Sequence, residues 1–305
     1  MKLSARSRVL VAGAVVGLVL ISGLAYFVLS RAGPSGKPVV VGSFYPYYYA
    51  ASAVGGDRVT AVNLVPPGVE PHDWEPSPQD MRAIYDASVF VFNGYVEAYL
   101  PRVFADLPAN GPLLVNTSAG MRTRNGTNGA IDPHVWLDPV RMSTIVNEVA
   151  EALSQKDPAG ASVYRANAQS LNASLESLDS AFLAGLATCA LRTIVVAHEA
   201  FGYLSDRYNL TMVAIEGLSP DAEPTPAKIQ EILNIVNQTG VRYIFYEALV
   251  DPHVAQTLAD EAHVQTMVLD PLEGLTADRA ATGANYLSIM RDTNLPNLWT
   301  ALGCS

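Results

Sequence analysis

The chain has 305 residues, of which 50% are hydrophobic, and its formal net charge is −10. That length can supply two hydrophobic cores of ordinary domain size. The negative charge argues against a nucleic-acid-binding protein, because a surface that holds phosphates needs a basic stripe. The two cysteines, Cys189 and Cys304, form no Cys-x-x-Cys pair, which disfavours a thiolate zinc site or a dithiol redox motif.

The N-terminal segment, residues 1–37, has the features of a membrane-targeting sequence. Basic residues precede an apolar run, Val9–Leu29, and a linker rich in glycine, proline and serine follows it. The run is long enough to cross a bilayer, and the basic residues ahead of it favour an inside N-terminus and an outside body. We therefore expect an extracytoplasmic protein that this helix anchors in the membrane, or a secreted one if the segment is cleaved. In an exported protein we also expect Cys189 and Cys304 to pair as a disulfide.

The first half, residues 38–157, alternates strand and helix patterns. Strands are expected at Pro38–Ser43, Val59–Val65, Ser88–Phe92 and Leu113–Val115. Such alternation is typical of a mostly parallel sheet with helices on its faces. An aromatic cluster, Phe44–Tyr49, follows the first strand, and it either packs at a domain face or forms a wall of a binding cleft.

The loop Val69–Asp80 sets His72 among acidic residues, an aromatic residue and three prolines. It leaves a predicted strand, which is where open α/β sheets place their ligand groups. Prolines fix φ and help the loop to keep its shape. Ser77 as N-cap, with Asp80 reaching back to it, predicts the start of a helix.

A long amphipathic helix is expected after the Asp157-Pro158 interruption. Apolar residues recur every three or four positions from Tyr164 to Leu186. We interpret residues 158–188 as a rigid connector between two domains; the alternative is an ordinary core helix of one domain.

The second half, residues 189–305, repeats the alternating pattern. Strands are expected at Thr193–Ala197, Met212–Ile215, Val241–Tyr246 and Thr266–Leu269, and a last helix at Ala277–Met290. Glu223–Pro226 repeats the pattern of Glu75–Pro78, which suggests two similar halves. The predicted fold class is therefore α/β, with two parallel-sheet lobes joined by a long connector helix.

Three histidines and one acid occupy equivalent positions in these halves. His72, His134 and His198 each lie on a loop of an alternating region, and Asp270 ends a strand. Three imidazoles and one carboxylate that meet in the cleft between the lobes would form a tetrahedral N3O site, which suits zinc.

The other titratable candidates have lesser roles. His253 and His263 are expected at the surface. Four acids are candidates to hold a ligating histidine through a hydrogen bond, or else to cap helices or lie at the surface. They are Glu75, Glu199, Glu216 and Glu247.

Four segments resemble the zinc/manganese-binding solute-receptor family of ABC importers, called cluster A-I or the ZnuA/TroA-like proteins. They read P-H-D-W-E-P-S-P-Q-D, D-P-H-V-W-L-D-P, V-V-A-H-E-A-F-G-Y-L and V-L-D-P-L-E-G-L. The resemblance implies two lobes, one long helix and a metal at the lobe interface. It places the ligands on His72, His134, His198 and Asp270. Manganese-type relatives carry Glu at the third of these positions, so His198 favours the zinc type.

The resemblance implies a receptor that captures Zn(II), with Mn(II) as the alternative cargo, and delivers it to the permease of an ABC-type importer. We expect a monomer that binds no nucleic acid and is not an enzyme. Asn116–Gly129 contains no histidine, although many zinc-type relatives carry a histidine-rich loop there.

Two other classes stay open. A zinc hydrolase needs an open coordination position, and the nearest match to H-E-x-x-H, at His198-Glu199, has Gly202 where the second histidine belongs. A surface adhesin with a structural metal, acting in cell adhesion, is the third class.

Overall fold

The computed structural model of the protein describes residues 36–220 and 224–305. The predicted membrane run, Val9–Leu29, lies outside the described residues. Contacts divide the chain into a unit Met1–Lys37 and a unit Pro38–Ser305, and the two predicted lobes both lie in the second unit. In the described part of the chain, no helix combines the length and the apolar character needed to cross a membrane.

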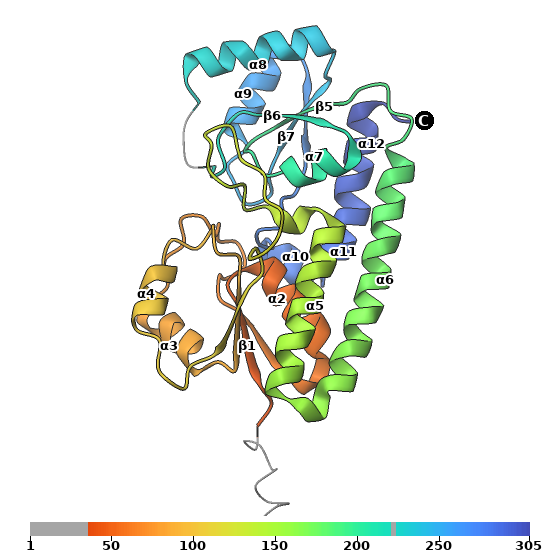
Figure 1. Ribbon diagram of the computed structural model, residues 1–305. Helices are drawn as coiled ribbons and strands as arrows, with labels where there is room; N and C mark the ends of the chain where they lie inside the picture. The colour runs from red at the N-terminus through yellow and green to blue at the C-terminus, as the bar shows by residue number, and fades with distance from the viewer. Residues whose placement is uncertain (1–35, 221–223) are drawn as a thin grey trace, which may run out of the picture. The chain divides into compact units, whose positions relative to one another are not determined.

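The first lobe is built on a four-stranded parallel sheet (Figure 1). Its strands are β1 (Val39–Gly42), β2 (Thr60–Asn63), β3 (Val89–Phe92) and β4 (Leu113–Asn116), in the order β2-β1-β3-β4. All residues of β3 are buried, as expected for a parallel strand that helices cover on both faces.

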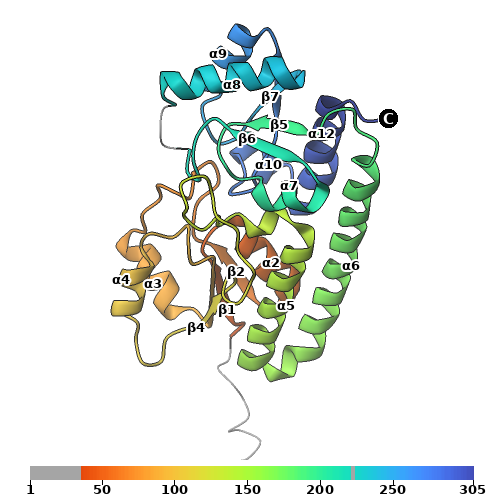
Figure 2. The same cartoon turned by 45° about the horizontal axis from the view of Figure 1, so that its top comes forward.

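Helices cover both faces of this sheet (Figure 2). On one face lie α2 (Tyr45–Gly55) and α5 (Pro139–Lys156), and on the other α3 (Pro78–Asp86) and α4 (Leu100–Ala105). The strands divide their side chains between the two sides, because successive residues point to opposite faces. Val89 and Val91 join the core beneath α2 and α5, whereas Phe90 and Phe92 join the core beneath α3 and α4.

The predicted start of α3 is confirmed. The Ser77 hydroxyl accepts a hydrogen bond from the Asp80 amide at 3.3 Å, and the Asp80 carboxylate accepts one from the Ser77 amide at 2.8 Å. This capping box fixes the end of the loop that carries His72.

The second lobe repeats the topology of the first. Its strands are β5 (Thr193–Val196), β6 (Thr211–Ala214), β7 (Tyr243–Tyr246) and β8 (Gln265–Val268), all parallel, in the order β6-β5-β7-β8. Helices α8 (Pro226–Thr239) and α9 (His253–Ala262) pack on one face. Helices α7 (Gly202–Tyr208) and α12 (Leu295–Leu302) pack on the other. The predicted α/β class with two parallel-sheet lobes is confirmed.

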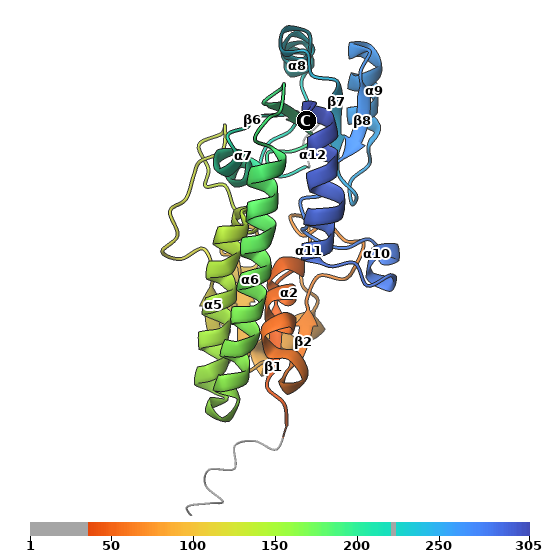
Figure 3. The ribbon, with the colours of Figure 1, turned by 90° about the vertical axis from the view of Figure 1, so that its right-hand side faces the viewer.

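Helix α6 (Ala161–Gly185) runs beside both lobes (Figure 3). One end lies beside α5 and α2 of the first lobe, and the other reaches α12 of the second. Its buried side chains, from Tyr164 to Phe182, belong to one hydrophobic core that also contains residues of β3 and of β5. The two lobes therefore share a core along this helix. Short 3-10 turns lie at η1 (Gly56–Arg58), η2 (Val135–Leu137) and η3 (Pro158–Gly160).

The prediction of one last helix, Ala277–Met290, is wrong. The chain forms α10 (Ala277–Ala281), α11 (Tyr286–Ile289), a π-helical turn η4 (Met290–Asn294) and then α12. Gly283 separates the first two helices with φ at 75°, a left-handed conformation that favours glycine. The Asn285 side chain then caps α11.

The expected disulfide joins Cys189 to Cys304 across 115 residues of sequence. It joins the point where the chain enters the second lobe to the C-terminal end of the chain, which lies in the same lobe. Backbone hydrogen bonds reinforce the junction, from Ala190 to Gly303 at 3.3 Å and from Leu191 to Leu302 at 2.9 Å. The C-terminal segment is thereby fastened to the segment that leads into β5.

Replacing Cys304 with serine should lower the free energy of unfolding by about 2–4 kcal/mol, because the unfolded chain is no longer cross-linked. Thermal denaturation with and without a reducing agent measures the effect. Reductant should lower the melting temperature of the unmutated protein and leave that of the variant unchanged. Two thiols that titrate in the denatured, unreduced protein would show that the cysteines do not pair.

Candidate metal centre

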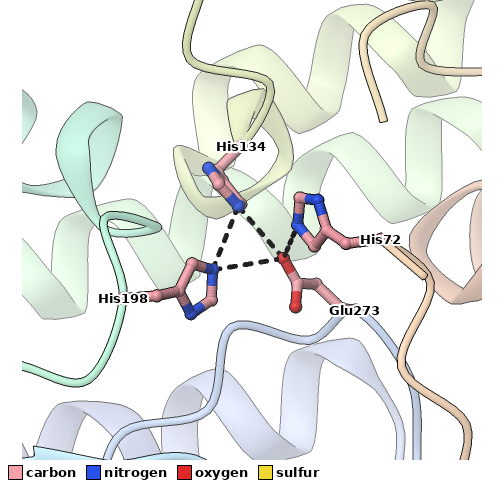
Figure 4. A group of neighbouring side chains, drawn as sticks. All are labelled: His72, His134, His198 and Glu273. Atoms are coloured by element: carbon pink, nitrogen blue, oxygen red, sulfur yellow. Dashed lines mark hydrogen bonds and ion pairs between the residues drawn. The ribbon is translucent and has the colours of Figure 1, made fainter. Parts of the chain in front are cut away.

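Four side chains from separate loops meet between the lobes (Figure 4). They are His72, His134, His198 and Glu273, and one ligand atom from each lies within 4.8 Å of the others. His72 follows β2, His134 follows β4, His198 follows β5 and Glu273 follows β8. The carboxyl ends of both parallel sheets therefore face the same point, as is usual for ligand sites in open α/β sheets.

The spacing of these atoms suits a tetrahedral ion. The Glu273 Oε1 atom lies 3.1 Å from His72 Nε2, 3.0 Å from His134 Nε2 and 3.5 Å from His198 Nε2. The Nε2 atoms of His134 and His198 are 3.2 Å apart. Zinc bonds of about 2.0–2.1 Å in a tetrahedron place neighbouring ligand atoms about 3.3–3.4 Å apart. All four measured separations lie near that value.

Asp270 is not part of this group. The carboxylate that lies beside the three histidines belongs to Glu273, whereas the sequence analysis expected that of Asp270 there. One Asp270 carboxylate oxygen accepts a hydrogen bond from the Leu272 amide at 2.7 Å, and the other pairs with Arg279. Leu272 adopts the left-handed conformation, with φ at 57°, and so turns the chain toward the histidines. The segment D-P-L-E-G-L contains both acids. The sequence analysis chose Asp270 because it ends a predicted strand, and it did not consider the turn between the two acids.

Contacts from both lobes hold the loop that carries Glu273. Asn294, in the π-helical turn, exchanges two hydrogen bonds with the Asp270 backbone, at 2.9 Å and 2.8 Å. Trp136 of the first lobe donates its indole N–H to the Pro271 carbonyl at 2.7 Å. A π turn at this position agrees with the frequent occurrence of such turns at functional sites.

Outer carboxylates orient two of the three imidazoles. His134 Nδ1 donates to Asp132 at 2.8 Å, and His198 Nδ1 donates to Glu247. Each bond fixes the tautomer in which Nε2 is free to face the cluster. Glu247 was among the four acids considered from sequence. Asp132 was not, although the short D-P-H spacing is itself a signal, since Asp132 also accepts from the His134 amide at 3.0 Å.

The other three acids have different partners or positions. Glu199 accepts hydrogen bonds from the Thr127 amide and hydroxyl at 3.0 and 2.9 Å. Glu75 pairs with Arg102 at the surface. Glu216 lines a cavity together with Glu199. The structure also agrees with the surface positions expected for His253 and His263, which are both exposed.

Glu273 and two of the histidines, His72 and His198, shift one another's pKa values. Burial lowers the pKa of His72, but the Glu273 carboxylate and further interactions outweigh it, so the net shift is upward. Burial also lowers the pKa of His198, yet Glu247 and Glu273 together raise it well above its ordinary value. Burial raises the pKa of Glu273, but His72 and His198 bring it well below its ordinary value. The cluster thus favours an ionised carboxylate among imidazoles.

Glu70 is a further acid beside the cluster that the sequence analysis did not single out. Its Oε2 atom accepts a hydrogen bond from the His72 amide at 2.8 Å. Burial, followed by repulsion from Glu273, raises the pKa of Glu70 to about 8.

Part of the aromatic cluster Phe44–Tyr49 packs in the hydrophobic core, whereas its role as the wall of a binding cleft stays a prediction. Phe44 is buried and packs against Trp136, with ring centroids 5.1 Å apart. Tyr45, Tyr48 and Tyr49 instead line a cavity of about 440 Å³ beside the loop that follows Glu273.

Comparison with known proteins places this arrangement in a family. A sequence model described as the periplasmic component A of zinc-uptake complexes, ZnuA, matches residues 40–300. The high-affinity zinc uptake system protein ZnuA of Bacillus subtilis is 33% identical over 267 residues, which cover 83% of this chain and 84% of that protein.

A second relative is the zinc-binding lipoprotein AdcA of Streptococcus pneumoniae. It is 34% identical over 293 residues, which cover 90% of this chain but 58% of AdcA, so this chain spans little more than half of that protein. The solved Zn(II)-bound ZnuA-like domain of AdcA superposes with a TM-score of 0.78 at 36% identity, covering 88% of this chain and 99% of that one.

A third is the laminin-binding protein Lmb of Streptococcus agalactiae, described as bifunctional, with adhesin and metal-transporting activity. Its structure matches with a TM-score of 0.80 at 30% identity and covers 87% of this chain and 100% of that one. Because the family match extends over nearly all of the described second unit, the chain belongs to the ZnuA family, the periplasmic A components of zinc-uptake complexes.

Proposed function

We propose that this protein is an extracytoplasmic receptor that captures Zn(II) and delivers it to an ABC-type importer. The observation that carries the proposal is the group of three imidazole nitrogens and one carboxylate oxygen at tetrahedral spacing. We assign His72, His134, His198 and Glu273 as the zinc ligands. Asp270 positions the loop that carries Glu273, because its carboxylate is engaged by the Leu272 amide and by Arg279.

Ligand chemistry supports zinc over manganese as the cargo. Imidazole nitrogen is a good donor for zinc, whereas manganese favours oxygen ligands in six-coordinate sites. Zinc also stands above manganese in the general affinity order of divalent ions. The hydrogen bonds of His134 to Asp132 and of His198 to Glu247 strengthen the two imidazoles as donors.

The descriptions of the family and of one relative support a position outside the cytoplasm. The family is described as a periplasmic component of zinc-uptake complexes, and one relative as a lipoprotein. We propose an ABC permease as partner, a body outside the cytoplasm held by residues 1–37, and a monomer. We also propose lobes at residues 38–157 and 189–305, joined by residues 158–188. The relatives are described as zinc-binding and zinc-uptake proteins, so we propose a binding protein and not an enzyme.

An adhesin is the second candidate function, because Lmb is described as having adhesin as well as metal-transporting activity. The two functions do not exclude each other. Reversible zinc binding supports the receptor, whereas unfolding of the protein on chelation would indicate a structural metal.

The test of the receptor function is calorimetric titration of zinc and manganese into the purified exported part. Zinc should bind more tightly than manganese. His198→Ala should weaken zinc binding by more than the 10–100-fold that is typical of losing an outer partner of a ligand. His198→Glu should weaken zinc binding and reduce the difference in affinity between zinc and manganese, because an oxygen ligand replaces a nitrogen ligand. Tighter binding of manganese by the unmutated protein would contradict the zinc assignment, and unchanged binding in His198→Ala would contradict the site.

Glu273 and Asp270 give a second, matched test, since they lie three residues apart on one loop. Glu273→Gln should weaken zinc binding more than about 100-fold, because it removes the anionic ligand. Asp270→Asn should weaken it by about 10-fold, as expected for a group that acts through another residue. The same calorimetric titration measures both variants. A larger loss of zinc affinity in Asp270→Asn than in Glu273→Gln would indicate that Asp270, and not Glu273, is the fourth ligand.

Zinc affinity should fall as the pH is lowered, because each imidazole must lose its proton before Nε2 can bind zinc. The pKa values of His72 and His198 are raised, so the fall should begin above the ordinary imidazole pKa of about 6.5. Titration at pH 7 in two buffers with different protonation enthalpies measures the protons released. Glu247→Gln is the control, since without that carboxylate His198 should release fewer protons. The same enthalpy in both buffers would contradict the prediction.

A further inference from the structure

The four proposed ligands differ in their access to solvent. The side chains of His134 and His198 are 0% exposed and that of Glu273 is 2% exposed, whereas that of His72 is 9% exposed. Of the four side chains, that of His72 is therefore the most exposed to solvent.

His72 is also held differently from the other two histidines. His134 and His198 are each fixed through Nδ1 by a carboxylate. His72 instead forms hydrogen bonds through Nε2, to Glu273, and through its backbone amide, to Glu70. Among the histidines of the cluster, His72 is the one whose ring can turn without breaking a bond to an outer carboxylate.

The Glu70 side chain interacts with Glu273 as well as with His72. Its Oε2 atom accepts from the His72 amide, its Oε1 atom is buried and receives no hydrogen bond from an N–H group of the described residues, and its carboxyl group interacts with that of Glu273. Two buried carboxyl groups in contact repel each other unless a proton or a cation lies between them, so this pair offers a place for a metal ion.

The segment that carries Glu70 lies against the segment that carries Glu273. The Gly68 amide donates to the Leu275 carbonyl at 2.8 Å. A Cβ atom on Gly274 would lie 3.3 Å from the Val69 carbonyl oxygen, so the two backbones are in close contact. The carboxyl groups of Glu70 and Glu273, one from each lobe, are thus brought together beside His72.

We propose that Glu70 is a transfer ligand, which binds zinc as the ion passes His72 on its way in or out. This inference rests on the proposed zinc-receptor function. Glu70 Oε2 keeps the His72 backbone in place while Oε1 binds the ion. During release the Glu70 oxygen takes up the coordination position that His72 Nε2 vacates, so zinc does not have to lose a ligand without replacement. Entry follows the same steps in reverse.

The proposal makes a kinetic prediction that separates a transfer ligand from a positioning residue. A transfer ligand lowers the barrier in both directions, so its loss should slow zinc binding and zinc release together. A group that only positions His72 would, when lost, speed up release and weaken affinity.

The test is stopped-flow measurement of zinc uptake and of zinc loss to a chelator, with the exported part of the protein. In Glu70→Gln the amide oxygen can still accept from the His72 amide, but the carboxyl group that binds the ion is gone. Both rate constants should fall about tenfold, with Kd changed by less than threefold. Glu75→Gln is the matched control, with the same charge change on the same loop at a side chain that is 61% exposed. Its rates should equal those of the unmutated protein.

Several outcomes would overturn the proposal. Unchanged rates in Glu70→Gln would do so, as would faster release with weaker affinity. Equal slowing in Glu75→Gln would assign the effect to net charge. Glu70→Ala, which removes both oxygens, must also slow exchange, so rapid exchange in that variant refutes the role even if Glu70→Gln does not fold. If the unmutated protein binds no zinc, the proposed function itself fails, and this result is distinct from all the others.

Discussion

The contact of one carboxylate oxygen with three imidazoles is the constraint on which the rest of this structure depends. Neither lobe alone could supply it, because Glu273 belongs to the second lobe, whereas His72 and His134 belong to the first. A displacement of one lobe by an ångström would change the separations of 3.0–3.5 Å that make the group suitable for zinc. The fold must therefore fix the lobes relative to each other as firmly as it fixes each sheet.

The shared hydrophobic core meets this requirement. Side chains of α6 pack in one cluster with residues of both sheets, and Trp136 of the first lobe donates to the Pro271 carbonyl of the second. Rotating the lobes apart would expose part of this core to water, at a cost of roughly 25 cal/mol for each Å² of apolar surface.

The sequence predicted most of the fold because its signals are local. Buried runs such as those of β3 and β5 mark strands, and the Ser77–Asp80 box marks the start of a helix. The three histidines follow from strand ends and neighbouring prolines. Glu273 could not be found in this way, since the choice between it and Asp270 depends on a left-handed Leu272 and on Arg279, which lies nine positions after Asp270. The outer partner Glu247 is 49 positions from His198, so no local pattern links the two.

The order of the four clustered residues along the chain has a consequence for how the protein is made. The histidines come first, and the backbone of Asp270, three residues before Glu273, is held by Asn294 near the end of the chain. The segment after Asn294 is in turn fastened by the disulfide of Cys304 to Cys189. A chain that emerges N-terminus first carries all three imidazoles only after His198 has been made, and it completes the four-residue group only when its last helices are in place. Assembly of the full set coincides with completion of folding.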